Sequence, residues 1–194
     1  MTTPNPDRRS ERARQAILDA ALELCQEQSY AGLTMEGIAK RAGVGKQTIY
    51  RWWPSKAAIL LEALAERGGS TLDFPDTGDV VADLRTQMTQ VVRSFTNPMF
   101  AAYSRGLISA AQSDPEIAAA VVATIVKPRV DLCVARLESA QKAGQVRPDI
   151  DLPDLVELLY APLYYRLLLH TRPVTKAQVD TILNLTFAGV APEA

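Results

Sequence analysis

The stretch from Thr34 to Lys56, TMEGIAKRAGVGKQTIYRWWPSK, decides the fold of this chain. Thr34 is a favourable N-cap for a short helix, because its hydroxyl can accept a hydrogen bond from a free backbone amide. Gly43 ends that helix, since glycine tolerates the left-handed conformation that a helix stop requires. A second short helix follows over about residues 45–53, and Pro54 stops it. Two short helices joined by a tight glycine turn predict a helix-turn-helix.

The second helix is predicted to have two distinct faces. Val44, Ile49 and either Trp52 or Trp53 are apolar and can face the domain itself. The polar residues fall in pairs four positions apart, so that they share the opposite face. That outward face carries a cation, an amide, a phenol and a guanidinium, which suit base edges and phosphates. Its members are Lys46, Gln47, Tyr50 and Arg51.

The rest of the chain is also predicted to be helical. Of its 194 residues, 47% are hydrophobic and 22% charged, a globular balance, and no run alternates with the period of a strand. Pro128 and Pro162 fall inside predicted helices and should kink them. We expect an all-α protein with a helix-turn-helix DNA-binding domain over 1–55 and a second helical domain over 56–194. About nine helices are expected, near residues 10–28, 35–42, 45–53, 56–67, 80–96, 98–112, 115–143, 153–170 and 176–189, with a linker over 68–79.

Charge is distributed unevenly along the chain. From Arg8 to Lys56 there are nine Lys and Arg against five Asp and Glu, a net of +4. From Gly68 onward there are eleven against fourteen, a net of −3. A basic front end favours a nucleic-acid partner, although such an imbalance also occurs in ordinary globular proteins. The first basic residues are either an arm that reaches a DNA groove or solvated side chains: Arg8, Arg9, Arg12 and Arg14.

The sequence offers no recognisable metal, cofactor or catalytic site. Cys25 and Cys133 lie far apart in helical patterns, as expected of buried thiols in a reducing compartment. His170 is the single histidine, and it fits a structural or exposed position better than a ligand contact. No apolar signal segment or run long enough to span a bilayer is recognisable. We therefore expect a cytoplasmic protein that is not an enzyme and has no membrane partner.

The last two predicted helices are apolar around most of their circumference. A helix of this kind must be buried on more than one side, and a second subunit can cover one of those sides. We expect a homodimer whose two-fold interface is formed by these helices. The residues predicted for that interface are Leu155, Leu159, Leu163, Leu167, Val179 and Leu183.

Residues 14–61 closely resemble the TetR/AcrR family of repressors. The resemblance is carried by AILDAA at 16–21, YAGLTMEGIA at 30–39, AGVGK at 42–46, TIY at 48–50 and PSK at 54–56. Residues 146–151 and 162–169 resemble one version of the family's C-terminal domain. Two positions depart from the family pattern: Gly45 replaces a capping residue such as serine, and Trp52–Trp53 replaces a more usual His/Tyr–Phe pair. Trp53 fits the core, whereas Trp52 either packs or contacts the DNA backbone.

The resemblance implies a transcriptional repressor that binds a palindromic double-stranded DNA operator as a homodimer. It places seven side chains at the DNA: Lys46, Gln47 and Thr48 in the groove, Thr34, Tyr50 and Lys56 on the backbone, and Arg51 on either a guanine or a phosphate. It also implies a small-molecule effector that releases the DNA. The helices between 80 and 126 supply apolar and aromatic candidates, which indicate an apolar or aromatic effector but also fit ordinary core positions. These candidates are Met88, Phe95, Phe100, Tyr103 and Leu107.

Two alternatives stay open at this point. The chain could be a helical small-molecule-binding protein or enzyme whose DNA-binding domain is vestigial. The intact set of Lys46, Thr48, Tyr50 and Lys56 argues against this, since such a protein has no reason to keep it. The sequence also leaves activation open beside repression.

Overall fold

The computed structural model describes the backbone of residues 6–68 and 74–190 and the side chains of residues 10–66 and 74–190. These described residues are mostly helical and contain no strand, which confirms the all-α prediction. Part of the predicted linker, residues 69–73, lies outside them, and so do the side chains of Arg8 and Arg9.

The helices separate into two compact units. The first unit is formed by residues 1–67 and 98–125, and the second by residues 68–97 and 126–194. The first unit therefore extends past the predicted domain boundary at residue 55, because three later helices join the helix-turn-helix. These are α4 (Lys56–Gly68), α6 (Pro98–Ala111) and α7 (Pro115–Val121).

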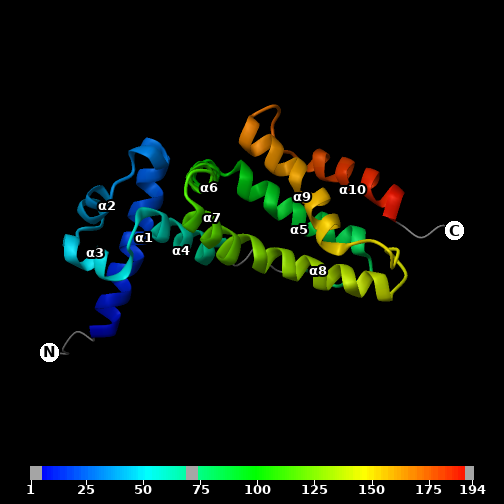
Figure 1. Cartoon of the computed structure of the whole chain (residues 1–194), viewed down its shortest axis with the longest axis horizontal. Coiled ribbons are helices and arrows are strands. Elements are labelled where there is room, and N and C mark those ends of the chain that lie inside the picture. Colours follow the sequence, from blue (N-terminus) through cyan, green and yellow to red (C-terminus); the bar gives the residue numbers. More distant parts are fainter. Residues whose placement is uncertain (1–5, 69–73, 191–194) are drawn as a thin grey trace. The chain divides into compact units, whose positions relative to one another are not determined.

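The first unit is built around α1 (Pro6–Gly32), which packs against α2 (Met35–Ala42) and α6 (Figure 1). The remaining helix, α3 (Lys46–Trp52), packs against α2. Buried side chains from all these helices except α7 share one core, against which α7 also packs apolar residues. Ser29, with φ 62° and ψ 172°, interrupts α1 close to the predicted helix end at residue 28.

A glycine permits the close approach of α1 and α6. A Cβ atom added to Gly106 would lie 2.5 Å from Cβ of Tyr30 and 3.3 Å from its Cγ. Contacts that short are excluded by van der Waals repulsion. Tyr30 also precedes the start of α2, so this contact helps to fix where the helix-turn-helix begins.

The second unit consists of α5 (Val80–Thr96), α8 (Lys127–Lys142), α9 (Leu152–Leu169) and α10 (Lys176–Val190). In it, α5 contacts each of the other three helices, and α9 lies between α8 and α10 (Figure 1). Polar groups lie inside this unit: the Tyr160 hydroxyl donates to Gln87, and burial raises the pKa of the neighbouring Cys133 thiol to about 12. The side-chain oxygen of Gln90 is buried and has no hydrogen-bond partner among the described residues.

The helix predicted over residues 115–143 is divided into three pieces. After α7 the chain forms a π-helical turn, Val122–Val126, and α8 then begins with Pro128 in its first turn. Proline lacks an amide hydrogen and its ring crowds the preceding turn, so a regular helix cannot pass through it unchanged. The predicted break near Pro128 is confirmed. Pro162 lies inside α9, which continues as one helix on both sides of it.

Candidate nucleic-acid interface

The turn between α2 and α3 is fixed by hydrogen bonds that the sequence predicts. Thr34 Oγ1 accepts a bond from the Gly37 amide at 3.0 Å and caps α2. Gly43 adopts φ 68°, and the amide of Val44 donates to the Ala39 carbonyl at 3.0 Å. This pair of features is the Schellman arrangement, which ends one helix and redirects the chain. The α3 helix is therefore held in a defined orientation within the first unit.

The α3 helix presents a polar face to solvent. Ile49 is completely buried, and Val44 is partly buried against the same core. Thr48 is half-buried, while the side chains predicted to contact DNA from the outer face are all exposed: Lys46, Gln47, Tyr50 and Arg51. The structure thus brings these predicted DNA-contacting residues together on one short helix, and their contact with DNA stays a prediction.

Lys46 is paired with an acidic residue of α2. Its Nζ lies 2.6 Å from Oε1 of Glu36, and both side chains are well exposed. The hydrogen bond between them raises the pKa of Lys46 and lowers the pKa of Glu36. A DNA phosphate would compete with this carboxylate for the same ammonium group.

The two adjacent tryptophans have different surroundings. Trp53 is buried, as predicted, and its Nε1 donates to Oε2 of Glu62 at 2.6 Å. Trp52 is half-buried and meets the Trp53 ring edge-on, with 5.4 Å between centroids. Its ring also lies 5.6 Å from the guanidinium carbon of Arg51, a cation–π distance that orients this arginine.

Lys56 forms hydrogen bonds within the first unit. Its ammonium group donates to the main-chain carbonyls of Tyr30 and Leu33, each at 2.8 Å, and lies 4.4 Å from the Tyr30 ring centre. It therefore ties the start of α4 to the segment that joins α1 and α2. Sequence reasoning missed this role, because backbone acceptors more than twenty positions away leave no pattern around the lysine. Its predicted contact with the DNA backbone stays a prediction.

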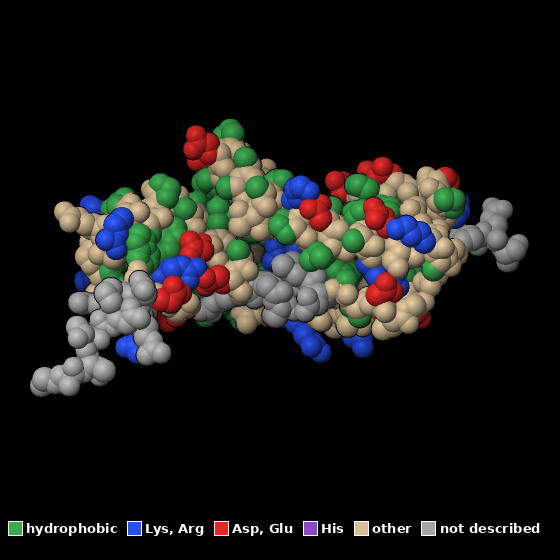
Figure 2. All heavy atoms as spheres, turned by 90° about the horizontal axis from the view of Figure 1, so that it is seen from below, with side chains coloured by type: hydrophobic (Ala, Val, Ile, Leu, Met, Phe, Trp, Pro, Cys, Tyr) green, Lys and Arg blue, Asp and Glu red, His purple; other side chains and the backbone are tan. Residues whose placement is uncertain are grey.

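Two arginines join helices of the first unit through ion pairs. Arg14 pairs with Glu62 and Glu66 of α4, and Arg41 of α2 pairs with Glu23 and Glu27 of α1. Figure 2 shows acidic and basic side chains lying close together over the face in view. Arg14 thus connects α1 to α4, and it is not a solvated side chain or part of an extended arm.

The six residues predicted for the dimer interface are buried within the chain itself. Leu159, Leu163, Val179 and Leu183 have no exposed surface, and Leu155 and Leu167 have almost none. They pack in the core of the second unit, and their contact with a second subunit stays a prediction. Other side chains of α9 and α10 are exposed: Leu158 (56%), Tyr165 (56%), Leu168 (37%), Leu169 (60%) and Leu185 (74%).

The five predicted effector-pocket residues fall in two different units. Met88 and Phe95 are buried in the second unit, where the Phe95 ring meets that of Tyr164 edge-on at 5.0 Å. Phe100, Tyr103 and Leu107 pack with the core of the first unit. The structure does not collect all five in one core, and their contact with an effector stays a prediction.

Predictions from the sequence also concern the single histidine, metal binding and membrane spans. His170 is exposed and caps α9 with φ 53°, which agrees with the expected structural or exposed position. Among the described residues, no three His, Cys, Asp or Glu side chains gather where they could hold a metal ion. None of the helices described has the length and apolar character needed to cross a membrane.

Comparison with known proteins identifies the class of this chain. Residues 17–63 match the family model described as bacterial regulatory proteins, tetR family, and residues 74–186 match the tetracyclin repressor-like C-terminal domain. The chain is 33% identical to the HTH-type transcriptional regulator YdeS of Bacillus subtilis over 182 residues, 94% of this chain and 91% of the relative. It belongs to the TetR family of transcriptional regulators.

Two solved structures illustrate the similarity in fold. The TetR family transcription regulator SCO0332 is 39% identical and has a TM-score of 0.75, covering 93% of this chain and 99% of that one. The fatty acid degradation regulator FadR of Bacillus halodurans has the same TM-score at 21% identity, and the match covers 91% of this chain and 98% of that one. At this identity the similarity shows the fold alone.

Proposed function

We propose that the protein is a repressor that binds a palindromic operator as a homodimer and is released by a small-molecule effector. The observation that carries the proposal is the exposed polar face of α3, held in place by the buried Ile49 and the turn at Gly43. Direct reading of a major groove needs such a face on a rigidly oriented helix. A vestigial DNA-binding domain would have no need for it.

The exposed residues of α3 suit different parts of the DNA. Gln47 suits an adenine edge, and Arg51 suits either a guanine edge or a phosphate. Thr34, Lys46, Thr48, Tyr50 and Lys56 are assigned to the groove wall and the backbone. Because the proposed partner is double-stranded DNA, we infer that the protein is located in the cytoplasm. We also infer that it is a regulator and not an enzyme.

Fluorescence anisotropy with a labelled duplex from upstream of the protein's own gene tests this function. Arg51→Ala should weaken binding at least tenfold, whereas Lys142→Ala, which removes an exposed cation from α8, should have little effect. If the wild type and Arg51→Ala bind the operator equally well, and also bind unrelated duplexes equally well, Arg51 has no role in DNA recognition. Absence of any preference for the upstream duplex would contradict the choice of operator.

The exposed side of α9 and α10 supports the homodimer. Leu158, Tyr165, Leu169 and Leu185 expose a large apolar area on neighbouring helices, which monomeric proteins seldom do. A two-fold axis would let this face cover itself in a second copy. A homodimer carries two α3 helices, whose separation must match the half-sites of a palindrome.

An effector would act on that separation. The proposed ligand is largely apolar or aromatic, in keeping with Met88 and Phe95 of the second unit. The buried, unpartnered oxygen of Gln90 offers one hydrogen-bond acceptor in the second unit. Linkage requires that a ligand which weakens DNA binding is itself bound less tightly in the presence of DNA.

A further inference from the structure

Three consecutive side chains at the end of α3 form a series of contacts that runs from the surface into the core. Arg51 is exposed, and the carbon of its guanidinium lies over the Trp52 ring, 5.6 Å from the ring centre. Trp52 is half-buried and meets the Trp53 ring edge-on, with 5.4 Å between centroids. Trp53 itself is buried. We call Arg51, Trp52 and Trp53 the α3 stack.

The inner end of the α3 stack is held in place by the rest of the first unit. Pro54 favours an extended backbone at the residue before it, and Trp53 has φ −131° and ψ 127°. Nε1 of Trp53 donates to Oε2 of Glu62 at 2.6 Å, and Glu62 also pairs with Arg14. A hydrogen bond to a carboxylate is stronger than one between neutral groups. Trp52 therefore packs against a ring whose position is fixed.

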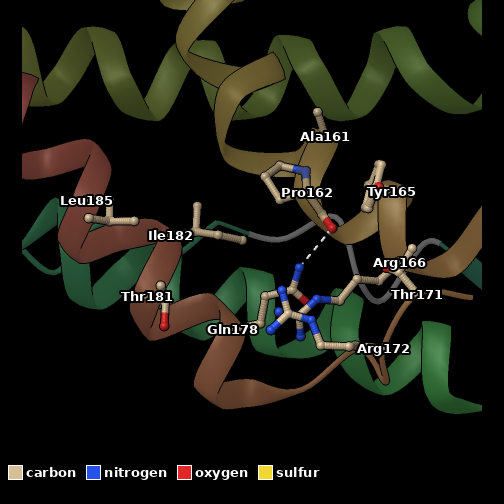
Figure 3. A pocket seen from close by; sticks show the side chains of 10 residues that line it. All are labelled: Ala161, Pro162, Tyr165, Arg166, Thr171, Arg172, Gln178, Thr181, Ile182 and Leu185. Atoms are coloured by element: carbon tan, nitrogen blue, oxygen red, sulfur yellow. Dashed lines mark hydrogen bonds between the residues drawn. The ribbon is translucent and has the colours of Figure 1, made fainter. Parts of the chain in front are cut away.

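The contact between Arg51 and Trp52 does not follow from their being neighbours in the sequence. Consecutive side chains on a helix point in directions about 100° apart and do not face each other. The second unit has a similar pair, Tyr165 and Arg166, which both line the groove between α9 and α10 (Figure 3). There Arg166 donates to the Pro173 carbonyl at 3.0 Å, and no cation–π contact joins the pair among the described residues.

We propose that Trp52 is a positioning residue, which holds Arg51 so that its guanidinium reads a guanine edge instead of binding a phosphate. This inference rests on the proposed function and decides between the two DNA contacts that suit Arg51. The Trp52 ring covers one face of the planar guanidinium, whereas the N–H groups lie in the plane and can still donate. Within the part of the chain whose side chains are described, Arg51 has no hydrogen bond or ion pair.

A guanine edge gains more from this arrangement than a phosphate does. Guanine presents two acceptors, O6 and N7, that match two parallel donors of an arginine. Such a bidentate contact requires the guanidinium plane in a defined place, and holding it there before binding reduces the cost of ordering the side chain. A phosphate also accepts a mobile positive charge, for which a positioned ring is not needed.

Lys46 shows the contrast on the same face of α3. Its ammonium lies 5.8 Å from the Tyr50 ring centre but also 2.6 Å from a carboxylate oxygen of Glu36. A DNA group must therefore displace an acceptor before it can bind Lys46. Nothing of this kind has to be displaced from Arg51, because a ring face, and not an acceptor, holds its guanidinium.

Guanine discrimination by the full-length protein tests the inference. The probe is the labelled duplex from upstream of the protein's own gene, whose G·C pairs are replaced by A·T one position at a time in both half-sites. The wild type should lose about tenfold in affinity at one position that Arg51→Ala does not distinguish. Trp52→Leu, which is apolar but has no ring, should reduce this loss to about threefold or less. Trp52→Phe keeps a ring and should retain the loss to within about twofold.

A double-mutant cycle separates positioning from general support of the fold. If Trp52 acts through Arg51, Trp52→Leu should weaken operator binding about threefold or more in the wild type. In the Arg51→Ala background the same substitution should change affinity by less than about 1.5-fold, because the group that it positions is already absent. A merely structural role would weaken binding equally in both backgrounds.

Acrylamide quenching tests the contact itself, without DNA and without a substitution of Trp52. The chain has two tryptophans, and because Trp53 is buried, the accessible emission comes from Trp52. Arg51→Ala uncovers one face of the Trp52 ring, so the quenching constant should rise. Lys40→Ala removes an exposed cation from α2 of the same unit and is the matched control, for which no change is expected.

The outcomes separate this inference from the proposed function. If Arg51→Ala weakens binding to every duplex by the same factor, Arg51 binds a phosphate and the inference is wrong. It is also wrong if Trp52→Leu keeps the guanine preference, if Trp52→Phe loses it, or if Arg51→Ala leaves the quenching constant unchanged. These results leave the proposed function standing, whereas a wild type that binds all duplexes equally overturns the operator and the guanine contact together.

Discussion

Asp83 and Arg136 form a buried ion pair between α5 and α8. Oδ2 of Asp83 accepts hydrogen bonds from Nη2 of Arg136 at 2.7 Å and from Nε at 2.9 Å. The other carboxylate oxygen accepts from the Thr77 hydroxyl at 2.7 Å. Both charged side chains are almost entirely buried, so each depends on the other for compensation.

Removing the charge of Asp83 should therefore destabilise the second unit strongly. Asp83→Asn leaves the Arg136 guanidinium buried without its main counter-ion, a change that typically costs about 3–5 kcal/mol. Asp76→Asn is the matched control, because Asp76 is 57% exposed and lies 3.5 Å from the same guanidinium. It should cost less than about 1 kcal/mol. Urea denaturation compares the two, and equal losses would show that burial of the pair does not decide its contribution.

The same carboxylate predicts a dependence of stability on pH. Burial alone would raise the pKa of Asp83, but hydrogen bonds from Thr77 and Arg136 outweigh it and lower the pKa below its ordinary 3.8. A pKa lowered by folding contributes stability above the unfolded value and loses it as pH falls through the folded value. The difference in unfolding free energy between wild type and Asp83→Asn should thus be constant near pH ~6 and shrink below pH ~4. A difference that grows on acidification would contradict this sign.

Lys56 is predicted to have a measurable structural role. Lys56→Ala removes two hydrogen bonds from a charged donor to the Tyr30 and Leu33 carbonyls, and each such bond contributes about 1.5–3 kcal/mol. The first unit should lose at least the contribution of one such bond, about 1.5 kcal/mol, whereas Lys40→Ala, at an exposed position of α2, should not.

The salt dependence of DNA binding separates this role from a phosphate contact. Each lost phosphate contact flattens the log–log salt slope by about 0.9, and a homodimer would lose two. Reduced stability with an unchanged slope would mean that Lys56 supports the fold and does not touch the backbone of DNA.

The sequence was sufficient for the helix-turn-helix because its determinants are local. Thr34, Gly43 and Pro54 each act within one turn of their own position, and the structure has the predicted helix boundaries there to within a residue or two. The roles of Arg14 and Lys56 could not be predicted in this way. Their partners lie on other helices, and no spacing near either residue marks them.

The core and surface leucines of α9 could not be separated from sequence for a different reason. Leucines occur all around this helix, so its pattern has no single apolar side, and the fully buried Leu159 and the exposed Leu158 are neighbours. Only the packing of α5, α8 and α10 against one side decides which leucines face inward. The same holds for Tyr103 and Leu107, whose aromatic and apolar character suits a pocket and a core equally.

The close contact between Gly106 and Tyr30 predicts that a larger residue at position 106 destabilises the first unit. Gly106→Ala would place a methyl group 2.5 Å from Cβ of Tyr30, so α1 and α6 must move apart, and such overpacking typically costs about 1–3 kcal/mol. Gly189→Ala is the control: this glycine is also helical, but an added Cβ meets nothing within 4 Å, so alanine should raise stability by up to about 1 kcal/mol. Because Tyr30 also supplies an acceptor for Lys56, the shift in Gly106→Ala should reach the start of α2 and weaken DNA binding as well. Thermal unfolding and the anisotropy assay measure the two effects, and a Gly106→Ala protein as stable as Gly189→Ala would show that the two helices can separate at no cost.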